Sequence, residues 1–385
     1  MLNLENCRLG DVSAIGTLGH LEIPGIRNSQ IEELPSEIGN LSRLKLLDMK
    51  GCNSLNRIAA GVLSGLSRLE ELYMGGFKNW GCTTTMEGNF EITNKNPSLA
   101  ELIPHADQLF EKEQNGILPC SLKDLTICRC EDLEYLLEAT SDCTPPNTLH
   151  LLESLSLEDL PRLIGICKST DSVEVEGGGI TASTTVAHKL FSSNTILWVP
   201  NLESLKVRHS RSLEAVFDLE GLKVKENRKP ILAVLSYLHL QNLSGMSHVW
   251  KNIPPGFQGF QNLRFINIVK CHSLRNLLPA SIAKLLVQLQ DVHIQDCNLM
   301  TNIIQKEHEV GEERIVDIIV FPKISHFTLH HLENLVSFSS EAHSFKWSSI
   351  GHIKLFRCSK LKTVEEISTI HSVVIYCIIN REIQV

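Results

Sequence analysis

The sequence lacks the short motifs that mark most catalytic and nucleotide-binding sites. It contains no G-x-x-x-x-G-K-[ST] phosphate loop, no H-E-x-x-H metal helix, no G-x-S-x-G nucleophile turn and no G-x-G-x-x-G turn. The glycine run Gly177–Gly179 precedes no segment with the pattern of a phosphate-binding helix. We therefore expect neither an enzyme nor a protein that holds a cofactor.

Long apolar runs and an excess of positive charge are also missing. No run approaches the length of a membrane-spanning helix, and the amino end lacks the basic and apolar regions of a signal peptide. The formal net charge of -8 provides no basic field that would favour nucleic acid or an anionic membrane. Aromatic residues are only 5%, but the hydrophobic content of 43% is sufficient for a large core.

What the sequence does contain is a repeat. The apolar pattern of residues 263–277 recurs 26 positions later in residues 289–303, in the form L-x-x-L-x-L-x-x-C. This is the leucine-rich-repeat pattern, in which each unit is one short strand and a return path. One unit cannot bury its apolar face alone, so neighbouring units must stack. We expect an α/β repeat solenoid, a leucine-rich-repeat horseshoe with a parallel β-sheet on the concave face and loops or short helices on the convex face.

The L-x-L pair predicts the first buried position of each strand. These positions are Leu2, Pro24, Leu47, Leu72, Leu125, Leu155, Leu205, Leu238, Ile266, Val292, Phe327 and Ile353. They predict one leucine-rich-repeat domain over 1–370, with about twelve irregular repeats and insertions near 75–117 and 168–199. Residues 371–385 would form a terminal strand or tail. Apolar residues at helical spacing after Pro279 predict a short helix on the outer side.

Half of the twelve cysteines occupy one recurring repeat position. They are Cys7, Cys52, Cys130, Cys271, Cys297 and Cys358. This placement indicates packing residues in a reducing compartment and predicts a cytoplasmic protein. Cys120, Cys128, Cys130 and Cys143 are close enough in sequence to suggest zinc, but the strand pattern places Cys128 and Cys130 on opposite faces. We expect no metal there.

The residues that flank each buried pair should form the concave surface, because side chains alternate along a strand. In the amino half they are Asp48, Lys50, Glu71, Tyr73, Thr126, Ser156 and Glu158. In the carboxyl half they are Lys206, Arg208, Tyr237, His239, Phe265, Asn267, Asp291, His293, His326, Thr328, His330, His352, Lys354 and Phe356. Exposed aromatic and arginine residues commonly anchor protein interfaces, so this set predicts a protein-binding surface. Some of these aromatic rings would instead cover gaps between strands.

Two histidines occupy the same position in adjacent predicted strands. His326 and His352 should lie about 5 Å apart, with Asp291 one strand further on. The three side chains are compatible with a metal site, a proton sensor or a polar contact surface. A flat ladder holds its side chains parallel, which disfavours convergence on a metal. We therefore expect protein binding without a metal.

Two segments carry a resemblance to a known family. IEELPSEIGNLSRLKLLDMKGCNSL and LVQLQDVHIQDCNLMTNIIQKE, with the acidic loop and the VFPKI restart after the second, resemble the leucine-rich-repeat region of plant coiled-coil nucleotide-binding leucine-rich-repeat (NB-LRR) disease-resistance proteins. The likeness covers nearly the whole chain. It implies an intracellular module that recognises a pathogen effector or a modified host protein and that restrains the receptor's nucleotide-binding domain.

The family's nucleotide-binding domain has no counterpart in this sequence. The chain would then be a fragment of such a receptor, and ATP or ADP binding carries over to none of its residues. The alternative is a stand-alone leucine-rich-repeat scaffold that supports protein assembly without sensing. Genomic sequence upstream of Met1 would separate the two, because an open frame with a phosphate loop supports the fragment.

Overall fold

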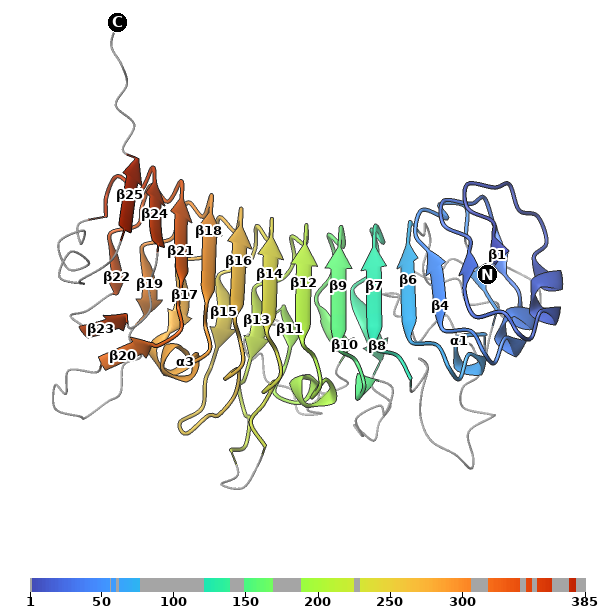
Figure 1. Cartoon of the computed structure of the whole chain (residues 1–385), viewed down its shortest axis with the longest axis horizontal. Coiled ribbons are helices and arrows are strands. Elements are labelled where there is room, and N and C mark those ends of the chain that lie inside the picture. Colours follow the sequence, from blue (N-terminus) through green and yellow to red (C-terminus); the bar gives the residue numbers. More distant parts are fainter. Residues whose placement is uncertain are drawn as a thin grey trace, which may run out of the picture. The chain divides into compact units, whose positions relative to one another are not determined.

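The structure is a computed structural model of the chain, and it forms two compact units. Unit 1 comprises Met1–Phe191 and Leu197–Val199, and unit 2 comprises Ser192–Ile196 and Pro200–Val385. Each unit contains a parallel sheet whose strands run side by side (Figure 1). The residues that the structure describes are 2–55, 57–59, 62–76, 121–138, 149–168, 188–224, 229–305, 318–339, 344–347, 352–361 and 374–378.

The larger sheet of unit 1 confirms the predicted strands of the amino half. In order across the sheet, its strands are β1 (Leu2–Asn3), β2 (Pro24–Gly25), β4 (Leu46–Met49), β6 (Glu71–Gly75), β7 (Asp124–Cys128) and β9 (Ser154–Glu158). The register pairs Leu47 with Leu72, and Leu72 with Leu125. β6 thus pairs directly with β7, although the segment near 75–117 lies between them in sequence.

The larger sheet of unit 2 likewise confirms the predicted strands of the carboxyl half. Its strands, again in order, are β12 (Ser204–Arg208), β14 (Tyr237–Gln241), β16 (Phe265–Val269), β18 (Asp291–Gln295), β21 (His326–His330), β24 (His352–Phe356) and β25 (Val374–Ile378). The predicted buried positions again pair with one another, as Leu238 does with Ile266. β25 lies within residues 371–385, where a terminal strand or tail was predicted, and the rest of that segment lies outside the described residues.

Strand β16 shows why the repeat folds in this way. Its side chains alternate, so Ile266 and Ile268 are 2% and 0% exposed while Phe265, on the other face, is 37% exposed. Leu263 before the strand and Cys271 after it are fully buried as well. The apolar positions of one repeat therefore enclose a core segment that is completed by the neighbouring repeats.

The cysteine position is confirmed as a packing position in four repeats. Cys52, Cys130, Cys271 and Cys297 are 0% exposed. The Sγ of Cys52 donates to the carbonyl oxygen of Ile26 in the preceding repeat at 3.1 Å, a weak hydrogen bond that ties adjacent repeats together. Burial raises the pKa of Cys271 to about 12.

The packing prediction is wrong for Cys7 and only partly right for Cys358. Cys7 is exposed, because it lies in the first repeat and no other described repeat covers its outer side. Cys358 is half-buried, although its Sγ still contacts the carbonyl oxygen of Leu329 at 3.7 Å. Burial at this position therefore depends on the neighbouring repeats as well as on the repeat pattern.

A residue with positive φ turns the chain after each strand of the larger sheets from β1 to β24, and from β6 onward it follows the strand directly. These residues are Asn6, Asn28, Gly51, Gly76, Arg129, Asp159, His209, Asn242, Lys270, Asp296, His331 and Arg357. The turn aims the backbone N–H at the neighbouring repeat, as in the bond from Lys270 to the carbonyl oxygen of Gln295 at 2.9 Å. Glycine and asparagine suit this conformation, whereas Arg, Lys and His give no sequence signal for it.

The return paths contain more strand than the predicted loops and short helices. Unit 1 has the parallel pairs β3 (Glu33–Leu34) with β5 (Arg57–Ile58) and β8 (Tyr135–Glu138) with β10 (Gly165–Lys168). Unit 2 has β13 (Ala215–Asp218) with β15 (His248–Lys251), β17 (Asn276–Pro279) with β19 (Asn302–Gln305) and β22 (Ser337–Ser339), and β20 (Ile318–Phe321) with β23 (Ser344–Trp347). The apolar residues of these segments therefore also pack as short parallel strands.

The helices among the described residues are few and short. They are α1 (Val62–Gly65), α3 (Ala280–Leu285), and the 3-10 turns η1 (Ser13–Thr17), η2 (Ser36–Asn40) and η5 (Thr195–Trp198). The helix predicted after Pro279 is confirmed as α3, but it ends at Leu285, with Leu286 as its C-cap. No helix in the described part of the chain is long and apolar enough to cross a membrane.

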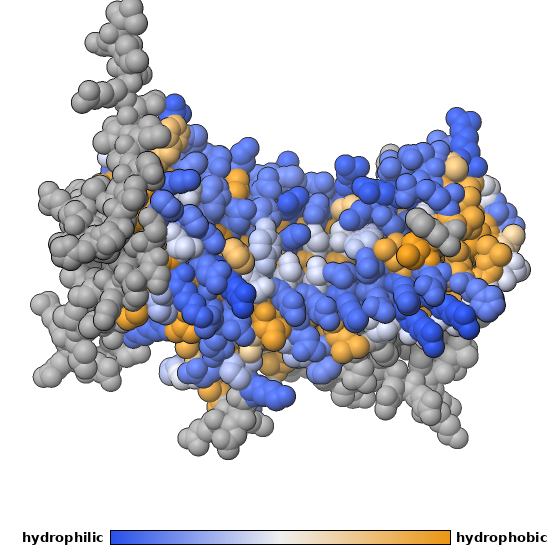
Figure 2. Space-filling model, in the orientation of Figure 1, coloured by the Kyte–Doolittle hydropathy of each residue, from blue (hydrophilic) through white to orange (hydrophobic). Residues whose placement is uncertain are grey.

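Most of the two predicted insertions lies outside the described residues. The described end of the second one contains β11 (Lys189–Phe191) and η5. Polar surface dominates the view in Figure 2, and apolar surface gathers at the end of unit 1 that holds β1. Leu18 and Ile23 are among the exposed apolar residues of that unit.

Leu240 provides a test of the repeat register. It is 0% exposed at the second buried position of β14, so Leu240→Ala should lower the free energy of unfolding by roughly 2–5 kcal/mol. The matched control Leu299→Ala truncates a leucine that is 49% exposed and should have little effect. Urea denaturation measures both. Equal midpoints for Leu240→Ala and the wild type would contradict the register of this strand.

The turn after each strand provides a second test. Gly51 has a φ of +75°, and an added Cβ would collide with the side-chain oxygen of Asn28. Gly51→Ala should therefore destabilise the chain by about 1–2 kcal/mol. Gly10→Ala is the control, because a Cβ there meets nothing within 4 Å. Thermal unfolding that ranks the two variants in the opposite order would refute this account of the turn.

Candidate protein-binding surface

The outward side chains of each larger sheet form a surface that we call the strand face. In unit 2 the register arranges it in three columns, the first being Ser204, Tyr237, Phe265, Asp291, His326 and His352. The middle column is Lys206, His239, Asn267, His293, Thr328 and Lys354, and the third is Arg208, Gln241, Val269, Gln295, His330 and Phe356. The predicted surface residues of the carboxyl half therefore share one face.

On the strand face of unit 1, acidic side chains lie around Tyr73. The Oη of Tyr73 donates to Glu71 at 2.6 Å, and the Nζ of Lys50 lies 4.4 Å from the ring centroid. Burial and the nearby carboxylates, Glu71 foremost, raise the pKa of Tyr73. Burial, aided by the charge of Glu71, also raises the pKa of Asp124. The predicted residues Asp48 and Glu158 lie on this face as well.

An aromatic cluster occupies the amino side of the strand face of unit 2. The ring centroids of Tyr237 and Phe265 are 6.4 Å apart, and the Nζ of Lys206 lies 5.7 Å from the Tyr237 ring. Phe265 keeps 37% of its surface exposed. The two predicted aromatic anchors and a cation therefore lie together on strands β12, β14 and β16.

Three predicted surface residues are buried. Thr126, Ser156 and His239 are 8%, 7% and 6% exposed, so these three residues are not exposed on the surface where they were predicted. Adjacent strands lie about 4.8 Å apart, so a larger neighbour covers a small side chain on the same face. Tyr73 lies beside Thr126 in the register, and the Tyr237 ring stacks on His239 at 6.4 Å. These residues support the face but offer little area to a partner.

The structure brings the two predicted histidines together. The rings of His326 and His352 stack with centroids 5.5 Å apart, and Asp291 lies on the next strand. The Nδ1 of His326 lies 2.8 Å from a carboxylate oxygen of Asp291. Across the described part of the chain, no group of three or more His, Cys, Asp or Glu side chains is arranged to hold a metal ion.

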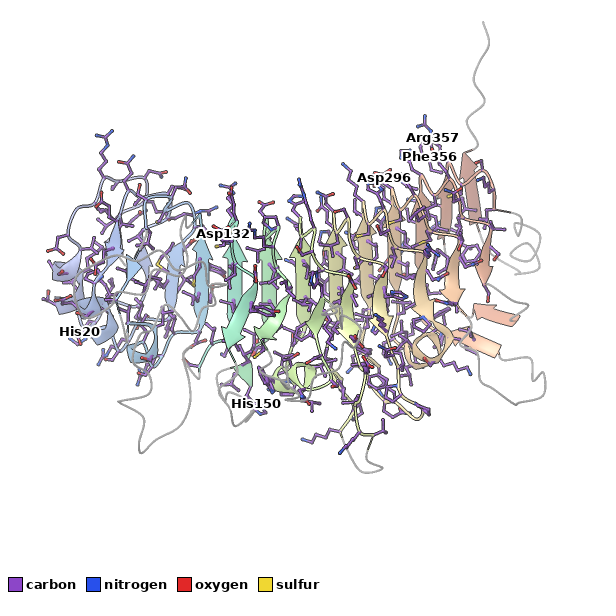
Figure 3. All side chains as sticks on the ribbon, turned by 180° about the vertical axis from the view of Figure 1, so that it is seen from behind. His20, Asp132, His150, Asp296, Phe356 and Arg357 are labelled. Atoms are coloured by element: carbon purple, nitrogen blue, oxygen red, sulfur yellow. The ribbon has the colours of Figure 1, made fainter. Side chains whose placement is uncertain are left out.

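Three residues near this face are missing from the predicted set. Asp296, His331 and Arg357 occupy the positive-φ position after β18, β21 and β24. They lie at the same edge as Phe356, as Figure 3 shows for Asp296 and Arg357. The alternation of side chains applies only within a strand, so the predicted surface did not include the turn residues. The sequence nevertheless marks these turn residues, because each lies directly before the recurring cysteine or leucine of its repeat.

His330 lies among groups that disfavour its charged form. Partial burial lowers its pKa, and His293, His331 and Lys354 act in the same direction against the opposing charge of Asp296. For Asp296, partial burial opposes ionisation, but hydrogen bonds from Gln295 and His331 outweigh it and lower the pKa. At neutral pH the free protein thus holds a neutral imidazole beside an ionised carboxylate.

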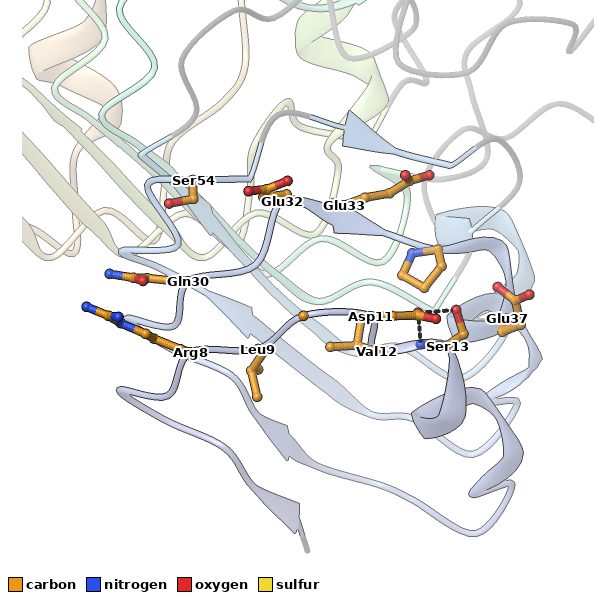
Figure 4. A pocket seen from close by; sticks show the side chains of 12 residues that line it. Arg8, Leu9, Asp11, Val12, Ser13, Gln30, Glu32, Glu33, Glu37 and Ser54 are labelled. Atoms are coloured by element: carbon orange, nitrogen blue, oxygen red, sulfur yellow. Dashed lines mark hydrogen bonds between the residues drawn. The ribbon is translucent and has the colours of Figure 1, made fainter.

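A hollow of about 800 Å³ in unit 1 is a weaker candidate. Its lining includes Arg8, Asp11, Gln30, Glu32 and Glu37 (Figure 4). The carboxylate of Asp11 accepts hydrogen bonds from the backbone N–H and the hydroxyl of Ser13, which lower its pKa. This carboxylate is thus already engaged at the start of η1.

His330 gives the strand face a pH dependence. Its pKa in the folded chain lies below the ordinary 6.5, so the unfolded chain binds the proton more readily. Its contribution to stability is fully present above about pH 6.5 and is lost as the pH falls through the folded-state pKa. NMR titration of the His330 ring should give a lower midpoint in the folded chain than in denaturant. A higher folded-state midpoint would contradict the arrangement.

Comparison with known proteins relates these repeats to one family. Residues 179–298 match the family described as "Plant disease resistance protein RPS2-like, leucine-rich repeats". The Arabidopsis thaliana protein SUPPRESSOR OF npr1-1, CONSTITUTIVE 1 is 22% identical over an alignment of 295 residues, and the alignment covers 71% of this chain and 19% of that relative. The chain thus spans about a fifth of the relative's length.

Solved structures give more distant likenesses. A leucine-rich-repeat protein of Leptospira interrogans aligns over 96% of this chain and 80% of its own, with 14% identity and a TM-score of 0.40. The plant peptide hormone receptor RGFR1 in complex with RGF2 aligns over 95% and 68%, with 11% identity and a TM-score of 0.20. The strand register and the family match together identify the repeats of this chain as leucine-rich repeats related to those of plant NB-LRR disease-resistance proteins.

Proposed function

We propose that the chain is the recognition region of a plant immune receptor and that its strand face in unit 2 binds a pathogen effector or an effector-modified host protein. The observation that carries this proposal is the cluster of Lys206, Tyr237 and Phe265. Aromatic side chains beside a cation supply large contact areas with few rotatable bonds, the usual composition of an interface centre.

The backbone of the strands under this cluster is already paired with neighbouring strands. β14 pairs with β12 on one side and β16 on the other, in register along all five residues. The core residues Leu238 and Leu240 are 0% exposed on the opposite face. Phe265 therefore contributes little to the core, and its exposed ring is available for a partner.

Two further features support a non-enzymatic role in the cytoplasm. The buried cysteines Cys52, Cys271 and Cys297 are free thiols, which fits a reducing compartment. Leucine-rich repeats of this kind are typically non-enzymatic protein-interaction modules. The related resistance protein is much longer than this chain, so we also propose that the repeats contact the nucleotide-binding domain of a complete receptor.

Substitution of the aromatic cluster tests the proposal. Tyr237→Ala and Phe265→Ala should each weaken binding to a recognised effector or host protein roughly five-fold or more, because each removes a central aromatic anchor. Binding to individually purified effectors and candidate host proteins is measured by biolayer interferometry. Val287→Ala is the control, since it truncates an apolar side chain that is 39% exposed near α3, away from the strand face.

Two outcomes would contradict the proposal. Unchanged affinity in both aromatic variants would place the interface elsewhere. If the chain binds no effector and no effector-modified host protein, but assembles constitutively with other host proteins, it is a scaffold without a sensing role.

A further inference from the structure

A second cluster lies at the carboxyl ends of β18, β21 and β24. We call it the carboxyl-edge cluster and define it as His293, His330, His331, Lys354, Phe356 and Arg357. The Phe356 ring is its centre, with centroid distances of 5.7 Å to His330 and 5.2 Å to His331. The guanidinium carbon of Arg357 lies 5.4 Å from the same ring centroid, and His293 meets His330 edge-on at 5.5 Å.

The two permanent cations of this region are not paired with its carboxylates. Its two nearby carboxylates are already engaged, Asp291 with His326 at 2.8 Å and Asp296 with His331 at 2.9 Å. Lys354 and Arg357 are exposed, and neither has an ion-pair partner in the part of the chain that the structure describes. Among the described residues, Lys354 and Arg357 thus present two permanent positive charges with no carboxylate at ion-pair distance, and the histidines add more when protonated.

The shape of the charge distribution indicates the chemistry of a ligand. A half-buried aromatic ring with the exposed Arg357 against it, and with the exposed Lys354 on the same strand, has the composition of an interface with an apolar centre and a charged rim. The strand face of unit 1 has the opposite sign, with Asp48, Glu71 and Asp124 on it. An anionic ligand would therefore be attracted by the carboxyl-edge cluster and repelled by the other strand face.

We propose that the carboxyl-edge cluster binds an acidic segment of a protein partner, with its carboxylates against Lys354 and Arg357 and an apolar side chain on the Phe356 ring. The inference rests on the proposed function and names the chemistry of the partner. An acidic protein fits better than nucleic acid, because the cluster has only two permanent cations on a chain of net charge -8 and nucleic acid usually requires many phosphate contacts.

Binding of such a segment is coupled to pH. The groups that face His330 are His293 from β18, Lys354 and Phe356 from β24, the adjacent His331, and Asp296. In the free chain the cations and the partial burial outweigh Asp296 and keep the ring neutral at neutral pH. Carboxylates of a partner favour the protonated rings, so complex formation takes up protons and affinity rises as the pH falls toward about 6.

The test uses the full chain and a defined probe. A fluorescein-labelled peptide of alternating Asp and Leu residues is titrated by fluorescence anisotropy, beside the matched peptide with Asn in place of every Asp. The double substitution Lys354→Gln and Arg357→Gln should weaken binding of the Asp peptide roughly ten-fold, because each exposed cation contributes about three-fold. Arg129→Gln is the matched control, since Arg129 occupies the same positive-φ position in unit 1.

The outcomes separate the proposal from its alternatives. Support requires tighter binding of the Asp peptide than of the Asn peptide, an affinity that rises with falling pH, and a loss confined to the double variant. Equal binding of both peptides, or no effect of the double variant, overturns it. Tighter binding of a single-stranded oligodeoxynucleotide that is lost in the same variant assigns the cluster to nucleic acid instead.

The aromatic variants distinguish this inference from the proposed function. If purified partners bind in a way that depends on Tyr237 and Phe265 but not on Lys354 and Arg357, the recognition surface stands and the acidic-segment assignment fails. If partner binding depends on neither pair, the proposed function fails as well. Circular dichroism and urea midpoints equal to those of the wild type show that the double variant remains folded.

Discussion

The structure depends on one constraint, which is that the inward pair of each strand can be buried only between two neighbours. Leu238 and Leu240 in β14 lie between the corresponding residues of β12 and β16, in a parallel register that does not slip by a single position. A shift of one residue would send both leucines to the strand face. The same constraint fixes the outward residues, because the register that buries Leu238 and Ile266 also places Tyr237 beside Phe265.

The turn after each strand connects neighbouring repeats through a backbone hydrogen bond. A backbone N–H held in the positive-φ conformation donates to the next repeat, as from His331 to the carbonyl oxygen of Phe356 at 2.8 Å. The conformation is costly for residues with a Cβ, yet Lys270, Arg357 and His331 adopt it. Contacts with the neighbouring repeats on both sides stabilise these residues in the positive-φ conformation. As a consequence, these charged side chains project from the ends of the strands beside the strand face.

Alternation and spacing were sufficient to predict the strands, the core positions and the neighbours of His326, because a parallel ladder converts sequence position into spatial position. They were not sufficient for features that depend on side-chain size or turn geometry. Thr126 is buried because of its larger neighbours, and Arg357 reaches Phe356 only through a turn that its residue type does not signal. The return-path strands were missed for a related reason, since segments as short as β3 or β22 are too brief to show a period.

The recurring cysteine has a chemical consequence beyond packing. Reaction with oxidants requires the thiolate, and a thiol whose pKa is raised to about 12 is almost entirely protonated at neutral pH. Cys271 also lies beyond the reach of solvent, at 0% exposure. A repeat with cysteine at this position thus gains a small apolar side chain that packs between repeats without a redox-sensitive centre. Cys7 occupies the same repeat position but is exposed to solvent, so sulfenic acid formation should begin at the surface and spare the interior.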